Sequence, residues 1–106
     1  FLTAYANDSG FEGVFARQIE ALGQPGDVLL GISTSGNSKN VLAAAKAAKD
    51  NQISVIAFTG ETGGQMADFA DLLVAIPSKI IMHIQECHIA LGHAITARVE
   101  TLLSEN

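Results

Sequence analysis

Short continuous runs of apolar residues recur along the chain, and each run is typical of a strand that is buried on both faces. The runs occupy residues 27–33, 53–58 and 72–76, and residues 3–6 read as the end of a fourth strand. Strands that are apolar on both faces occur mainly in parallel sheets, because helices cover such sheets from two sides. The pattern therefore predicts a parallel sheet in the interior of the domain.

Segments with helical periodicity or helix-favouring residues separate these runs. They cover residues 9–22, 39–49, 65–69 and 80–104. Gly92 lies within the last of them, where a glycine lowers helix stability, so it indicates close packing of the backbone there. The alternation of strands and helices predicts a single α/β domain over residues 1–106, built as a doubly wound, flavodoxin-like parallel sheet between two layers of helices.

Composition and charge narrow the possible partners. The 106 residues are 48% hydrophobic and 16% charged, as expected for one globular domain with a substantial core. The net charge is −5 and the six Lys and Arg residues are scattered, so we expect no nucleic-acid partner. No apolar run is long enough for a membrane span, and no signal peptide is recognisable. The single cysteine, Cys87, fits a cytoplasmic location and is expected in the core.

The loop after the first complete strand carries the clearest candidate chemistry. Residues 33–38 read Ser-Thr-Ser-Gly-Asn-Ser and lead directly into the helix predicted from residue 39. The hydroxyl groups are short donors, Gly36 permits a tight turn, and the N-terminus of a helix attracts anions. A dianionic phosphate suits all three features. The alternative is an ordinary connecting loop in which Ser38 caps the helix, and the residues alone leave both interpretations open.

The stretch from Gly26 to Ser38 resembles the signature of sugar isomerase (SIS) domains, and most closely that of the phosphoheptose isomerases, which act on sedoheptulose 7-phosphate. The similarity continues in order through five further motifs. These are Asn7-Asp8, Phe58-Thr59-Gly60, Gly63-Gly64, Ile76-Pro77-Ser78 and Ile84-Gln85-Glu86 followed by His88. Because the predicted sheet is thin and the chain begins at Phe1, we expect an N-terminally truncated domain that lacks the family's first helices.

The resemblance implies an isomerase that converts sedoheptulose 7-phosphate to D-glycero-D-manno-heptose 7-phosphate through an enediol, a step toward the heptose of bacterial lipopolysaccharide. The substrate-binding residues it implies are Asn7, Asp8, Ser33, Thr34, Ser35, Ser38 and Gln85. It further implies that Gln85 and His93 are catalytic and bind Zn²⁺, with the other two zinc ligands upstream of Phe1. In the family, the active sites lie between the subunits of a homotetramer.

The last predicted helix supplies polar groups that such a reaction needs. Moving a proton between adjacent carbons requires an acid, a base and groups that stabilise charge on oxygen. Gln85 and His93 lie along one slowly turning stripe of this helix. A regular helix separates them by about 12 Å along its axis, so only long side chains that lean together could share one ligand. His88 is expected to be a packed or surface histidine rather than a ligand.

The rival interpretation is a SIS domain without catalytic activity, which binds phosphosugars or serves as a protein scaffold. A replication-initiation factor resembles the isomerases but acts as a tetrameric scaffold. It typically carries Arg at the position of Ser35 and lacks a histidine that matches His93. This chain has both isomerase-like residues. One departure is His83, where the isomerases commonly have Arg, and it leaves the contacts beside Gln85 open.

Overall fold

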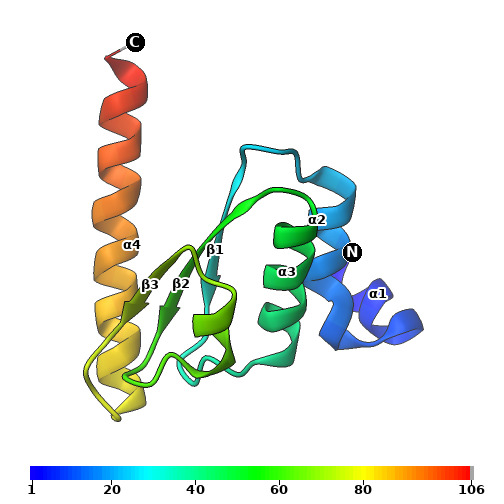
Figure 1. Cartoon of the computed structure of the whole chain (residues 1–106), viewed down its shortest axis with the longest axis horizontal. Helices are drawn as coiled ribbons and strands as arrows, with labels where there is room; N and C mark the ends of the chain where they lie inside the picture. Colours follow the sequence, from blue (N-terminus) through cyan, green and yellow to red (C-terminus); the bar gives the residue numbers. More distant parts are fainter. Residues whose placement is uncertain (106) are drawn as a thin grey trace.

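The computed structural model describes residues 1–105, in which helices alternate with three strands (Figure 1). The helices are α1 (Leu2–Ser9), α2 (Val14–Leu22), α3 (Lys39–Asp50) and α4 (Ile81–Ser104), with short 3-10 helices η1 (Phe11–Gly13) and η2 (Gly64–Asp68). The strands are β1 (Val28–Ile32), β2 (Ser54–Thr59) and β3 (Leu72–Ala75). In Figure 1, α2 and α3 lie on one side of the sheet and α4 lies on the other, so the predicted α/β arrangement is confirmed.

The three strands form one parallel sheet in the order β1-β2-β3. Val28 of β1 is aligned with Ser54 of β2, and Ile56 of β2 is aligned with Leu72 of β3. Because the strands are parallel, their carboxyl ends meet at one edge, where ligands of such sheets usually bind. Loops that are far apart in the sequence therefore become neighbours at this edge.

The N-terminal segment differs from the prediction. Residues 3–6 are not the end of a strand but lie within α1, and residues 9–22 do not form one helix. The helix α1 ends at Gly10, whose φ of 96° favours glycine, and α2 begins only at Val14. The rings of Phe1 and Tyr5 lie 5.5 Å apart, one helical turn from each other. This local contact favours the helix, and it is not visible in the hydrophobic pattern.

The core lies between α3 and the sheet. Ala45 and Ala48 of α3 are fully buried, because their small side chains let the helix approach the strands closely. They form one cluster with Val55 and Ala57 of β2, and Met66 of η2 fills the adjacent space. The helix α2 packs against α3 from outside. This packing fixes the N-terminus of α3 relative to the carboxyl ends of the strands.

Much less of α4 is buried. Within residues 81–104 only Ile84 and His88 are buried, and the C-terminal half extends away from the sheet (Figure 1). A Cβ on Gly92 would meet no described atom within 4 Å, so the expected close packing there is wrong. Cys87 is exposed rather than in the core, because α4 turns only a narrow stripe toward the sheet. None of the helices in residues 1–105 is long and apolar enough to cross a membrane.

Candidate functional site

The serine loop, residues 33–38, connects the carboxyl end of β1 to the N-terminus of α3 and is tied by its own side chains. Ser33 is buried, and its Oγ lies 2.8 Å from Oγ of Ser38. The same oxygen accepts the Ser38 N–H at 3.3 Å. The Asn37 N–H donates to Ser35 Oγ at 3.1 Å. These bonds hold the hydroxyl groups together at the end of the helix.

Ser38 occupies the N-cap position of α3, but its side chain makes no capping hydrogen bond to the helix. The hydroxyl contacts Ser33 instead. The positive end of the helix dipole therefore faces the serine loop without a cap from Ser38, and Asn40 Oδ1 accepts the Val41 N–H at 2.9 Å within the first turn. Of the two interpretations that the sequence leaves open, this geometry favours an anion-binding loop over an ordinary capped connection.

A second loop, residues 60–64 and here called the glycine loop, touches the backbone of the serine loop. Gly36 has a φ of 71°, and a Cβ on it would lie 2.1 Å from the carbonyl oxygen of Gly63. Gly64 has a φ of 54°, and its Cβ would lie 2.5 Å from the carbonyl oxygen of Ser35. Only glycines permit this approach. The pair at 63 and 64, which sequence reasoning treated as a simple turn, thus supports the serine loop.

Backbone hydrogen bonds join the same two segments. The Gly60 N–H donates to the Thr34 carbonyl at 2.9 Å, and the Met66 N–H donates to the Gly36 carbonyl at 2.9 Å. Met66 is fully buried in the core beneath the loops. The serine loop is therefore held from both sides by backbone that belongs to the next βα connection.

Thr34 and Ser35 line an open hollow of about 340 Å³ at the carboxyl edge of the sheet. The other lining residues come from the glycine loop, from the β3–α4 connection and from the start of α4: Gly60, Glu61, Thr62, Ser78, Lys79, Ile81 and Ile84. A hollow of this size is in the range of small-molecule sites. The lining combines polar groups with two isoleucines, which suits a sugar phosphate.

Four polar lining residues were not assigned by sequence reasoning: Glu61, Thr62, Ser78 and Lys79. A signal for them existed, because each follows a strand of a parallel sheet, where ligands bind. Lys79 Nζ lies 3.6 Å from Glu61 Oε1, and the Lys79 side chain is largely exposed. Lys79 is the one cation among the residues that line the hollow. Its ammonium group is therefore free to pair with an anionic ligand as well as with Glu61.

The predicted catalytic residues Gln85 and His93 both lie exposed on α4. Gln85 follows Ile81 by one helical turn and shares its side of the helix, and Ile81 lines the hollow. His93 lies two turns further on, about 12 Å along the axis of a regular helix. Gln85 does not itself line the hollow but lies one turn from Ile81, which does, and His93 lies farther along the helix.

Asn7 and Asp8 lie exposed in the last turn of α1, and not at a strand end or at the start of the next helix. Asn7 Nδ2 contacts Asp8 Oδ1 at 3.4 Å. Neither residue lines the hollow beside the serine loop. The premise that put them at the carboxyl end of a strand is wrong, because the segment before them is helical.

The expected zinc ligands do not form a complete site within residues 1–105. No group of three or more His, Cys, Asp or Glu residues in that range could hold a metal ion. Gln85 and His93 supply at most two ligands, whereas a zinc site needs three or four. The described residues therefore do not by themselves fit the ion.

An ion pair lies near the amino ends of β2 and β3, away from the candidate site at the carboxyl ends of the strands. Lys49 Nζ hydrogen-bonds Asp71 Oδ1, and the Val55 N–H donates to Asp71 Oδ2 at 2.7 Å. The hydrogen bond from Lys49, followed by that from Val55, holds the pKa of the Asp71 carboxyl below its ordinary value. This pair stabilises the pairing of β2 with the start of β3.

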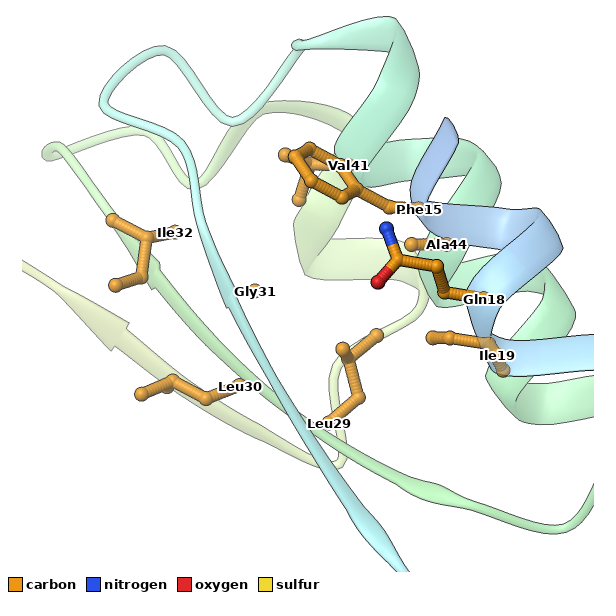
Figure 2. A pocket seen from close by; sticks show the side chains of 9 residues that line it. All are labelled: Phe15, Gln18, Ile19, Leu29, Leu30, Gly31, Ile32, Val41 and Ala44. Atoms are coloured by element: carbon orange, nitrogen blue, oxygen red, sulfur yellow. The ribbon is translucent and has the colours of Figure 1, made fainter. Parts of the chain in front are cut away.

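A second hollow, of about 360 Å³, lies between β1 and the helices α2 and α3 (Figure 2). Figure 2 shows Leu29 directed toward α2, whereas Leu30 and Ile32 point to the other side of β1. Gln18 is its one polar side chain, and Gln18 Nε2 donates to the Val14 carbonyl at 3.2 Å. An apolar lining of this kind does not suit a sugar phosphate, which leaves the hollow at the serine loop as the candidate site.

The comparisons with known proteins agree with this fold. The profile of the SIS domain family matches residues 2–60, and the chain belongs to that family. Within it, the chain is similar to proteins named phosphoheptose isomerase. It is 53% identical to that of Mycobacterium tuberculosis over 96% of this chain and 52% of the relative. It is 51% identical to that of Aquifex aeolicus over 98% of this chain and 54% of the relative.

Solved structures of proteins with the same name share the fold. The chain superposes on the phosphoheptose isomerase of Neisseria gonorrhoeae with a TM-score of 0.85 and 52% identity, over 88% of this chain and 53% of that one. For the phosphoheptose isomerase of Francisella tularensis the TM-score is 0.89 with 39% identity, over 94% of this chain and 56% of that one. The chain thus spans about half the length of the relatives it matches.

Proposed function

We propose that the protein is a phosphosugar ketose–aldose isomerase that converts sedoheptulose 7-phosphate to D-glycero-D-manno-heptose 7-phosphate. The observation that carries the proposal is the serine loop at the N-terminus of α3, where clustered hydroxyl groups and the positive end of the helix dipole suit a dianionic phosphate. The similarity to phosphoheptose isomerases over nearly the whole chain supports this choice of substrate.

In the proposed reaction, the serine loop holds the phosphate and the sugar extends along α4 from Gln85 toward His93. Gln85 orients the oxygens of the reacting carbons, and His93 exchanges a proton as acid or base while the enediol forms and collapses. The roles of Gln85, His93, Asn7 and Asp8 follow from the family resemblance. The positions of Ile81 and Gln85 on one side of α4 support the role of Gln85.

Zinc is part of the proposal only through the resemblance. Gln85 and His93 would contribute two ligands, and the remainder would come from parts of the protein outside residues 1–105. No step above is assigned to the ion. Metal analysis of the purified full-length protein and of a Gln85→Ala variant tests this expectation directly.

A homotetramer in the cytoplasm completes the proposal. Ile89, Ile95 and Val99 are exposed on α4. Exposed apolar side chains along one helix suit contact with another subunit. Analytical ultracentrifugation of the full-length protein checks the oligomeric state.

The decisive test is incubation of the full-length protein with sedoheptulose 7-phosphate in D₂O, followed by NMR of the sugar. We expect an aldoheptose phosphate with deuterium at the carbon next to the carbonyl. His93→Ala should lower kcat by about 10²- to 10⁴-fold, as for loss of a general acid–base group. Cys87→Ser, an exposed change on the same helix, is the matched control and should retain full activity.

Phosphosugar binding without conversion or deuterium exchange would contradict the isomerase proposal and favour a binding or scaffold domain. Absence of binding as well would contradict the assignment of the serine loop. The two results are separated by measuring inorganic phosphate affinity alongside turnover.

A further inference from the structure

Helix α4 carries the proposed reacting groups, yet it has few attachments to the rest of the domain. Ile84 and His88 are the two buried residues within residues 81–104, one turn apart on one side of the helix. Ile84 is 3% exposed and His88 is 4% exposed. Gln85 lies between them in the sequence and is exposed. The position of Gln85 therefore depends on what these two side chains contact.

His88 makes a directional contact. Its Nε2 lies 2.9 Å from the carbonyl oxygen of Thr59, the last residue of β2. A carbonyl oxygen only accepts, so Nε2 carries the hydrogen and the neutral ring is the Nε2–H tautomer. The same oxygen accepts the Ile76 N–H at 3.0 Å. The His88 ring also packs on the buried ring of Phe58, with centroids 5.5 Å apart.

The other ring nitrogen of His88 has no hydrogen-bond partner among residues 1–105, although it is buried. A buried polar atom left in this way lowers stability, and a packing residue such as Leu would avoid the cost. A histidine at this position is therefore poorly explained by packing alone. Its distinctive contribution is the single donor group that reaches the end of β2.

The acceptor lies at the point where the serine loop is also tied. Thr59 accepts from His88, and the next residue, Gly60, donates to the Thr34 carbonyl of the serine loop. The end of β2 thus links the serine loop on one side with α4 on the other. We propose that His88 is a positioning residue: its Nε2–H bond to Thr59 sets α4, and with it Gln85, against the serine loop.

The proposal rests on the proposed function, and its test separates positioning from mere packing. In the full-length protein, His88→Gln retains a donor of similar reach. His88→Leu removes the donor, and His88→Asn carries its donor on a shorter side chain. We expect His88→Leu and His88→Asn to lower kcat about tenfold, the effect of one lost buried hydrogen bond. His88→Gln should stay within about threefold of the unmodified protein. Leu91→Ala, which trims half-buried packing one turn beyond His88 and outside the hollow, is the matched control.

Two further readouts exclude a purely structural effect. Affinity for inorganic phosphate should be unchanged in all four variants, because the serine loop is tied by its own bonds. The loss in kcat should not add to that of Gln85→Ala in the double variant, since both act through Gln85. Additive losses, equal losses in His88→Gln and His88→Leu, or weaker phosphate binding that follows thermal stability would overturn the proposal.

NMR makes the failure of this proposal distinguishable from that of the proposed function. With sedoheptulose 7-phosphate as the probe, the side-chain amide signal of Gln85 should shift in the unmodified protein and in His88→Gln, but not in His88→Leu. This holds whether or not the sugar is converted. Imidazole nitrogen spectra should show hydrogen on Nε2 of His88. Hydrogen on Nδ1 instead, or a Gln85 shift that persists in His88→Leu, would contradict the positioning role.

Discussion

The serine loop and helix α4 carry the two halves of the proposed site, and they are held in opposite ways. The serine loop is fixed by many contacts. Its hydroxyl groups contact each other, its backbone hydrogen-bonds the next βα connection, and Gly36 packs against Gly63. Helix α4 has two buried residues and one side-chain hydrogen bond to the end of β2. A binding element and a reacting element of one site thus differ in how firmly the described chain holds them.

This difference suggests a division of labour. A phosphate site gains from rigidity, because preorganised donors bind an anion without a cost of ordering. A helix held at one end can be placed by contacts from elsewhere in the protein, including another subunit. Substitutions that remove buried contacts of the serine loop should therefore alter stability and binding together, whereas most substitutions on α4 should alter neither.

The same substitution at two glycines tests the contrast most strongly. Gly36→Ala should lower the free energy of unfolding by about 3 kcal/mol or more, because a Cβ there meets the Gly63 carbonyl at 2.1 Å in a left-handed backbone. Gly92→Ala, with no described atom within 4 Å, should raise it by about 0.5–1 kcal/mol. Urea denaturation of the two variants measures both. Equal effects would contradict the contrast.

A smaller effect is expected from paired serine substitutions. Ser33→Ala should lower stability by about 1–2 kcal/mol, because it removes a buried hydroxyl that contacts Ser38 and accepts its N–H. Ser35→Ala removes an exposed hydroxyl whose bond from the Asn37 N–H water can replace, and it should cost less than about 0.5 kcal/mol. Both should weaken inorganic phosphate binding in calorimetry. Phosphate binding that is unaffected by either change would contradict the assignment of the serine loop as the phosphate site.

The smallest effect concerns the amino ends of the strands. There the chain has one exposed ion pair, in contrast to the many contacts of the serine loop. The lowered pKa of Asp71 means that its carboxylate stabilises the fold above the ordinary carboxyl pKa of about 4 and that this contribution is lost as pH falls through the folded value. Asp71→Asn should therefore lower the melting temperature slightly between pH 5 and 8. The difference should shrink below about pH 4 and in high salt.

Thermal melts of both proteins across this pH range supply the measurement. A difference that grows as the pH falls would contradict the assigned direction of the Asp71 pKa. Lys49→Met, which removes the partner charge, should reproduce the effect.

The sequence predicts the central elements well because each carries a strong local signal. The β-branched run Ile53–Phe58 and the alanine-rich segment Lys39–Lys49 correspond to β2 and α3 within one or two residues. The serine loop is recognisable because its residue types and its place between a strand and a helix are both local. The expectations for Gly92 and Cys87 are wrong because the hydrophobic pattern of a helix does not reveal how much of its surface packs against other elements.

Features that depend on contact between distant segments could not be predicted. The break at Gly10 depends on how α1 packs, and Gly13 shows this because a Cβ on it would lie 2.9 Å from the Tyr5 hydroxyl. The role of Gly63 depends on Gly36, which is distant in the sequence. The burial of His88 depends on the end of β2. Local propensity carries no information about such pairs, since only the completed sheet brings them together.

The contact of Gly36 with Gly63 and of Gly64 with Ser35 has a practical consequence for protein engineering. The serine loop is not a portable module, because its shape is set by backbone contacts with a second loop. A graft of residues 33–38 onto another parallel-sheet scaffold should collapse or widen unless residues 60–66 are transplanted in the same relative position. The transferable unit is the pair of adjoining βα turns, and sequence searches for such sites should require both.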